Sequence, residues 1–148
     1  MKKISIGQWL LMAAALLVFA ALKIAMVYWY AERDPAPQAV TDEACDVRRG
    51  CKLPNGATLR TFGKLHPKTP FRMRLLNAPA ATQSVYVEFS MKDMDMGFNR
   101  YKLLPPDADH EHWYADTVRL PVCVVARKDY LLDIYLDGVG YQIAFDSD

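Results

Sequence analysis

The chain has 148 residues and a formal net charge of +1, which leaves room for one ordinary domain of about one hundred residues beside an apolar N-terminal segment. Its 18 Lys and Arg nearly balance its 17 Asp and Glu, so the overall charge indicates no surface built to neutralise phosphates. Nucleic-acid binding is therefore disfavoured.

The first predicted element is an apolar helix over residues 9–30, WLLMAAALLVFAALKIAMVYWY. Its 22 residues, interrupted by the one charge of Lys23, exceed the roughly 20 that cross the hydrocarbon core of a bilayer. Lys2 and Lys3 precede it, and the positive-inside rule then places the N-terminus in the cytoplasm. Its length and its bulky aromatic end favour a retained anchor; a cleaved signal peptide is the alternative.

Three segments follow from this pattern. We expect residues 1–32 to form the cytoplasmic N-terminus and the transmembrane anchor, and residues 33–44, with two prolines and no apolar period, to form a spacer. Residues 45–148 then form a periplasmic domain on a bacterial inner membrane, crossed once by the chain.

Cys45, Cys51 and Cys123 would lie in this oxidising compartment, where one disulfide and one leftover thiol is the simplest arrangement. A bond between Cys45 and Cys51 encloses five residues, whereas a bond between Cys51 and Cys123 ties the first strand to a late one. The sequence leaves both pairings open. Neither spacing is the C-x-x-C of a redox enzyme.

The domain is predicted to be mainly β, because short runs of strand formers alternate with Pro, Gly, Asn and Asp and no window favours a helix. The expected strands cover 57–62 (ATLRTF), 71–76 (FRMRLL), 84–91 (SVYVEFSM), 111–120 (EHWYADTVRL), 121–126 (PVCVVA), 130–136 (YLLDIYL) and 139–145 (VGYQIAF). The last two meet at Asp137-Gly138, the strongest hairpin signal in the chain. Seven or eight such strands indicate an immunoglobulin-like β-sandwich.

The segment 90–101, SMKDMDMGFNRY, is the main candidate for a site because it carries Met91, Met94 and Met96 within six positions. In an extended chain Met94 and Met96 project from one face, where two thioethers could hold Cu(I), the ion that sulfur ligands select. Met91 is a possible additional ligand. The competing interpretation is that these methionines fill gaps in the core.

His110 and His112 form an H-x-H pair that could add ligands to such a site, although histidines beside acidic residues are more often simply solvated. No nucleophile elbow, P-loop, H-E-x-x-H or glycine-rich dinucleotide turn occurs in the sequence. The sequence therefore predicts no enzyme and no catalytic residue.

The layout of one inner-membrane helix, an outer β-sandwich and the turn M-D-M-G at 94–97 resembles the small periplasmic proteins of copper handling and cytochrome oxidase assembly, the FixH-like and YtkA-like domains. This resemblance implies Cu(I) delivery or support of oxidase assembly, with Met94 and Met96 as the ligands. The expected partner is a membrane-embedded complex such as an oxidase. The alternative is a metal-free interaction or structural module that presents a sheet edge or the Met-rich loop to an inner-membrane complex.

Overall fold

A computed structural model describes residues 5–31, 36–40, 45–94, 96–106, 111–123 and 127–148. The chain divides into two compact units, residues 1–35 and residues 36–148.

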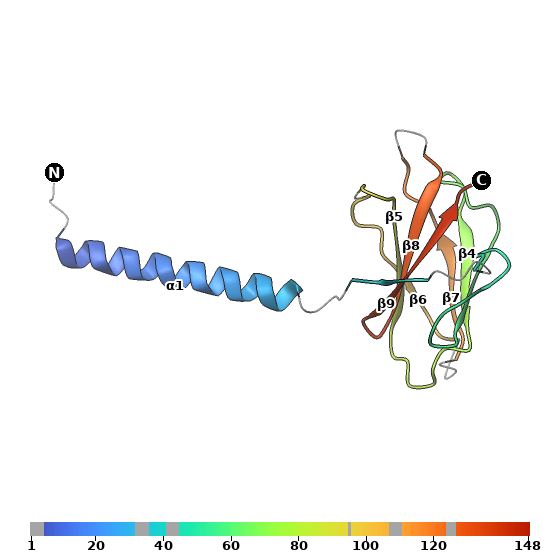
Figure 1. Ribbon diagram of the computed structural model, residues 1–148, viewed down its shortest axis with the longest axis horizontal. Coiled ribbons are helices and arrows are strands. Elements are labelled where there is room, and N and C mark those ends of the chain that lie inside the picture. The colour runs from blue at the N-terminus through green and yellow to red at the C-terminus, as the bar shows by residue number, and fades with distance from the viewer. Residues whose placement is uncertain (1–4, 32–35, 41–44, 95, 107–110, 124–126) are drawn as a thin grey trace. The chain divides into compact units, whose positions relative to one another are not determined.

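The first unit consists of α1, which runs from Ile6 to Ala31 (Figure 1). Ser5 begins it as a capping box, because Gln8 N–H donates to Ser5 Oγ and Ser5 N–H donates to Gln8 Oε1. The 24 residues from Ile6 to Trp29 contain an 18-residue window with a mean hydropathy of 2.5, and none of that window is buried within the structure. A 26-residue helix is about 39 Å long, longer than the ~30 Å hydrocarbon core. The chain thus has the membrane-spanning type of helix that its sequence predicts.

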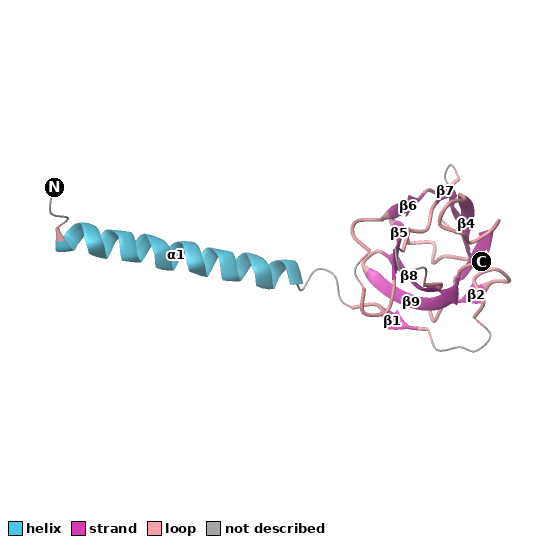
Figure 2. Ribbon diagram, turned by 90° about the horizontal axis from the view of Figure 1, so that it is seen from above, coloured by secondary structure: helices cyan, strands magenta, loops and turns pink. Residues whose placement is uncertain are grey.

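The second unit is a sandwich of two β-sheets, which confirms the predicted fold class (Figures 1 and 2). Its strands are β1 (Gln38–Ala39), β2 (Cys51–Lys52), β3 (Thr58–Phe62), β4 (Phe71–Leu76), β5 (Val85–Ser90), β6 (Tyr101–Leu103), β7 (Trp113–Val118), β8 (Asp129–Leu136) and β9 (Val139–Asp146). One sheet has the order β1-β9-β8-β5-β6 and the other β2-β3-β4-β7. All neighbouring strands are antiparallel except β1 and β9.

The core lies between the inner faces of the sheets and follows the period-two alternation of the strands. Phe71, Met73 and Leu75 of β4 are buried as the sequence predicts, and they face the apolar positions of β5 and β8 across the sandwich. Backbone bonds between Leu104 and Tyr114 connect the two sheets along one side.

The β8–β9 hairpin turns at Asp137 and Gly138, with φ values of 49° and 87°. Two successive left-handed residues are what a two-residue hairpin loop requires, so this prediction is confirmed. The Asp137 carboxylate also accepts hydrogen bonds from the N–H groups of Gln83 and Ser84, at 3.0 and 2.7 Å to Oδ1. The hairpin turn therefore also fixes the start of β5.

Two segments differ from their prediction. Pro121 to Cys123 is not a strand, and residues 124–126 lie outside the described residues, so the strand expected over 121–126 is not observed. Because Pro121 lacks a backbone N–H, it cannot donate a hydrogen bond to a neighbouring strand. Gln38 and Ala39, inside the expected spacer, form β1, because the edge of β9 offers unpaired backbone groups: Val40 N–H donates to Gln142 O at 2.8 Å.

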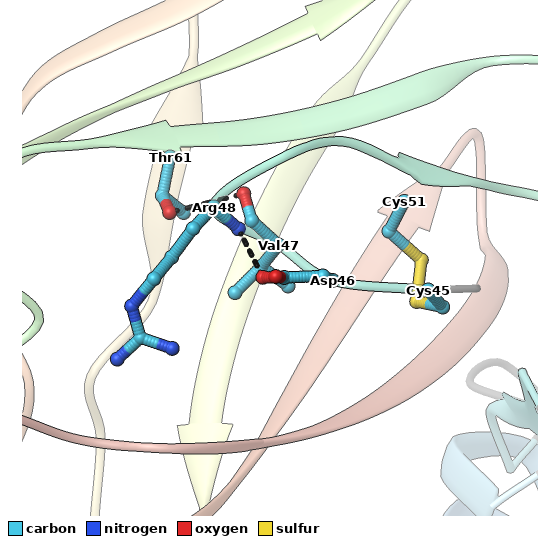
Figure 3. The surroundings of a disulfide bond; sticks show 6 residues. All are labelled: Cys45, Asp46, Val47, Arg48, Cys51 and Thr61. Carbon is cyan, nitrogen blue, oxygen red and sulfur yellow. Dashed lines mark hydrogen bonds between the residues drawn. A yellow bond between two sulfur atoms is a disulfide. The ribbon is translucent and has the colours of Figure 1, made fainter. Parts of the chain in front are cut away.

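The structure joins Cys45 to Cys51, the first of the two pairings that the sequence leaves open (Figure 3). The bond closes a loop whose buried residue is Val47, and the Val47 carbonyl accepts hydrogen bonds from the N–H and the Oγ1 of Thr61, at 2.7 and 3.1 Å. Asp46 Oδ1 accepts the N–H of Arg48, and this bond is the main cause that lowers the pKa of Asp46. The disulfide loop is thus bonded to β3.

Candidate functional site

The candidate site is built on the methionine loop, residues 91–99, which connects β5 to β6. It begins with a tight turn in which Met94 N–H donates to Met91 O at 3.0 Å and Met91 N–H donates back to Met94 O at 3.4 Å. Asp93 adopts a left-handed conformation there, with φ of 61°. The chain reverses between Met91 and Met94. The step from Met94 to Met96 passes through a residue outside the described ones, so the placement of these two methionines on one face stays a prediction.

The three methionines differ in burial. Met91 is 2% exposed and belongs to the core, while Met94 and Met96 are half-buried and pack against that core. Asp95 between them lies outside the described residues. Packing thus accounts for all three side chains, and Cu(I) binding by Met94 and Met96 stays a prediction.

The two histidines lie elsewhere. His112 is half-buried just before β7 and lines a cavity of about 390 Å³ together with Arg74 and Tyr114 of the four-stranded sheet. His110 lies outside the described residues. Within the described part of the chain, no three His, Cys, Asp or Glu side chains gather as a metal-binding group.

The end of the methionine loop is fixed by the side chain of Asn99. Its Oδ1 accepts the N–H of Phe89 at 2.6 Å, and its Nδ2 donates to Phe89 O at 2.7 Å and to Gly97 O at 2.9 Å. At the other end of the loop, Arg127 donates to Lys92 O at 3.2 Å. The loop backbone is therefore held at three places, by the tight turn, by Asn99 and by Arg127.

Phe98 stands on this fixed loop with 91% of its surface exposed, the highest exposure among the described large apolar side chains of the domain. Single exposed apolar residues are common on protein surfaces. An aromatic ring held out by a well-bonded loop, however, has the form of an interface anchor, since little conformational entropy is left to lose on binding.

Two carboxylates lie next to this ring. Glu88 and Asp133 are directly opposite each other on β5 and β8, and with Phe98 and Asn99 they line a cavity of about 300 Å³. Glu88 pairs with Arg100, whose guanidinium lies 4.2 Å from the centre of the Tyr86 ring.

Asp133 is the less well compensated of the two carboxylates. Gln142 Nε2 donates to its Oδ1 at 2.9 Å. Burial raises the pKa of Asp133, the bond from Gln142 lowers it, and the charge of Glu88 raises it further. The surface beside Phe98 can therefore receive a cationic or hydrogen-bond-donating group, which would compensate these two oxygen acceptors.

Cys123, the cysteine outside the disulfide, is half-buried. It lines a separate cavity of about 260 Å³ with His66, Arg127 and Tyr130. The Tyr130 hydroxyl donates to Pro121 O at 2.8 Å, and burial raises its pKa. This bond fixes the segment that carries Cys123.

Sequence reasoning identified the methionine loop but not the roles of Phe98 and Asn99. The available signal is Gly97-Phe98-Asn99 after a strand, in which Gly permits the positive φ of 68° and Asn offers both a donor and an acceptor. Comparison with models of protein families, with curated proteins and with solved structures gave no match.

Proposed function

We propose that this protein is a membrane-anchored, non-enzymatic interaction module that docks Phe98 and the adjoining carboxylates onto a membrane protein complex. The observation that carries the proposal is the 91% exposure of an aromatic side chain on a loop whose backbone is bonded on both sides. A partner that fits this surface offers an apolar pocket for the ring and a basic or amide group for Glu88 and Asp133.

The proposed location is the periplasmic face of a bacterial inner membrane, with the N-terminus in the cytoplasm. The apolar α1 supports the anchor, and the disulfide supports an oxidising compartment. By its resemblance to FixH-like and YtkA-like domains, the partner complex is proposed to be an oxidase under assembly.

Site-specific photocrosslinking in native membranes tests the docking surface. A photoreactive phenylalanine analogue at position 98 of the full chain is expected to capture one integral membrane protein. The same analogue at Val139, which is 48% exposed at the start of β9, serves as the control. Equal capture from both positions would contradict the proposal.

The Phe98→Ala variant adds an energetic test. Because the ring contacts solvent, its loss is expected to leave the melting temperature unchanged while partner binding weakens about 30-fold, as at an interface hot spot. Unchanged partner binding by a folded Phe98→Ala protein would remove Phe98 from the docking surface.

The second candidate function is weak Cu(I) binding by Met94 and Met96 in support of copper handling or oxidase assembly. The partial exposure of these two thioethers, in contrast to the burial of Met91, favours it. Cu(I) titration of the full chain is expected to show a site that the double variant Met94→Ala, Met96→Ala lacks. Met12→Ala in α1 is the matched control, and equal affinity in all three proteins would exclude this function.

A further inference from the structure

The outer face of the four-stranded sheet carries an arginine face, defined as Arg60, Arg72 and Arg74. Arg60 of β3 lies directly opposite Arg74 of β4, and Arg72 lies opposite Phe62. All three side chains are exposed, and alternation along β3 and β4 places them on the side away from the core. The guanidinium groups of Arg60 and Arg74 lie 5.0 and 5.6 Å from the centre of the Phe62 ring.

Four other arginines of the domain have carboxylate partners, and Arg119 donates to Lys68 O at 3.4 Å. The ion pairs join Arg48 to Asp148, Arg49 to Asp46, Arg100 to Glu88 and Arg127 to Asp129. In the described part of the chain, no ion pair joins a carboxylate to any member of the arginine face. The four strands of this sheet contain one acidic residue, Asp116, against Lys52 and the three arginines.

Such an arrangement costs stability, because like charges directly opposite each other on a sheet repel. The contacts with Phe62 offset part of this repulsion. An anion bound across the strands would remove it. Guanidinium groups bind phosphate and carboxylate alike through two parallel N–H bonds, so phosphate esters are among the anions that this face fits.

A cavity that could hold one phosphate ester adjoins the arginine face. Arg74 lines the cavity of about 390 Å³ together with Leu76, Tyr114 and His112. This volume falls within the range of small-ligand sites, roughly 300–1,000 Å³. Its lining combines the Arg74 guanidinium with one carboxylate, Asp116, and with aromatic and apolar side chains, as expected of a site at a lipid–water boundary.

The short connection to α1 decides among the sources of phosphate. The chain between Ala31 and Ala36 spans at most about 18 Å when fully extended. If α1 crosses a bilayer, the domain stays beside that bilayer, where headgroup phosphates are the most concentrated anions it meets.

We propose that the arginine face binds the phosphate groups of anionic phospholipids in the membrane that holds α1. This inference rests on the membrane anchor of the proposed function but not on the Phe98 docking surface. Binding of headgroups by Arg60, Arg72 and Arg74 would orient the domain on the bilayer.

Vesicle flotation tests the proposal on the full chain in nanodiscs of phosphatidylcholine, a lipid with no net charge. The loaded discs are mixed with vesicles of phosphatidylcholine alone or with added phosphatidylglycerol. We expect the discs to float only with phosphatidylglycerol vesicles and to be released as salt is raised. The triple variant Arg60→Gln, Arg72→Gln, Arg74→Gln is expected to bind about 100-fold more weakly, as for the loss of three basic side chains near an anionic surface.

The matched control removes the same charge elsewhere, with Lys92→Gln, Lys102→Gln and Lys128→Gln, three exposed positions outside the four-stranded sheet. Equal weakening of both triple variants would overturn the proposal in favour of net charge alone. Equal flotation of the wild type with both kinds of vesicle would also overturn it, because binding would not depend on anionic lipid. No flotation with either kind of vesicle would overturn it as well and would leave an acidic protein as the partner of this face. Elution of the chain together with the discs shows whether α1 anchors it in lipid. The Phe98→Ala variant is expected to float like the wild type. Failure of the Phe98 docking surface is therefore distinguishable from failure of lipid binding by the arginine face.

Discussion

At the scale of single residues, the amide of Asn99 replaces a strand partner that β5 lacks. Strand β6 pairs with β5 only from Val85 to Val87, so the backbone of Phe89 lies beyond it. Asn99 supplies both the acceptor and the donor that this backbone needs, at 2.6 and 2.7 Å. One side chain thus continues the sheet and fixes the loop that carries Phe98.

Asn99→Ala is expected to lower the free energy of unfolding by about 1–3 kcal/mol, because it leaves a part-buried N–H and C=O without their partners. Urea unfolding of the full chain in detergent measures this loss. Gln83→Ala, which removes an exposed amide bonded to Ala81 O, is the control and is expected to cost less than about 0.5 kcal/mol. Equal losses of unfolding free energy in the two variants would show that the hydrogen bonds of Asn99 do not stabilise the domain more than an exposed amide does.

Asp133 leads to a pH-dependent prediction. Burial raises its pKa in the folded state above the usual value near 4, so its ionised form is disfavoured by folding and stability falls as pH rises through the folded pKa. Asp133→Asn is therefore expected to gain up to about 1 kcal/mol at neutral pH, since it also removes a like charge opposite Glu88.

This gain is expected to vanish below about pH 4, where the wild-type carboxyl is protonated as well. Unfolding curves at neutral and acidic pH provide the measurement. Asp116→Asn, on the other sheet, controls for the loss of one charge. A gain of equal size at both pH values would mean that charge is not its cause.

At the scale of elements, the Cys45–Cys51 bond stabilises the edge at which β2 and β3 begin the four-stranded sheet. Cys51 is fully buried and lies opposite Leu59 of β3, and Val47 inside the loop is buried as well. The disulfide therefore constrains a segment with little regular structure of its own.

Replacement of both cysteines, Cys45→Ala with Cys51→Ala, is expected to cost about 2 kcal/mol, the chain entropy of a loop this short. Thermal melting of wild type and variant gives the difference. A reductant should lower the melting temperature of the wild type toward that of the double variant and leave the melting temperature of the double variant unchanged. Cys123→Ala is the control for loss of a thiol, and a reductant effect on the double variant would contradict this assignment of the bond.

At the scale of the whole molecule, the proposed location of the domain depends on α1. Alkaline carbonate is expected to leave the full chain in the membrane fraction, because the 24-residue span from Ile6 to Trp29, which is apolar apart from Gln8 and Lys23, is long enough to cross the hydrocarbon. In spheroplasts, added protease is expected to digest the domain and to spare a tag on the N-terminus. Inverted vesicles are the control, in which the pattern should reverse; release by carbonate would refute the anchor.

Local pattern was sufficient for several elements. The apolar run up to Trp29 determines α1, the alternation of Phe71, Met73 and Leu75 determines the inner face of β4, and Asp137-Gly138 determines the hairpin. Each of these depends on residues near one another in sequence, where a helical or period-two spacing is itself the physical cause.

Other features depend on contacts between distant residues, and only the tertiary structure decided them. The pairing of Gln38 with Tyr141 turns part of an expected spacer into β1, and the register of β3 against β4 brings Arg60 beside Arg74. In the sequence, Arg60 stands twelve residues before Arg72 and each arginine alternates with apolar residues, so only the pairing of β3 with β4 shows that the three share one face. Strand register and edge pairing select which side chains share a surface, and they are set by the balance of packing over the whole domain.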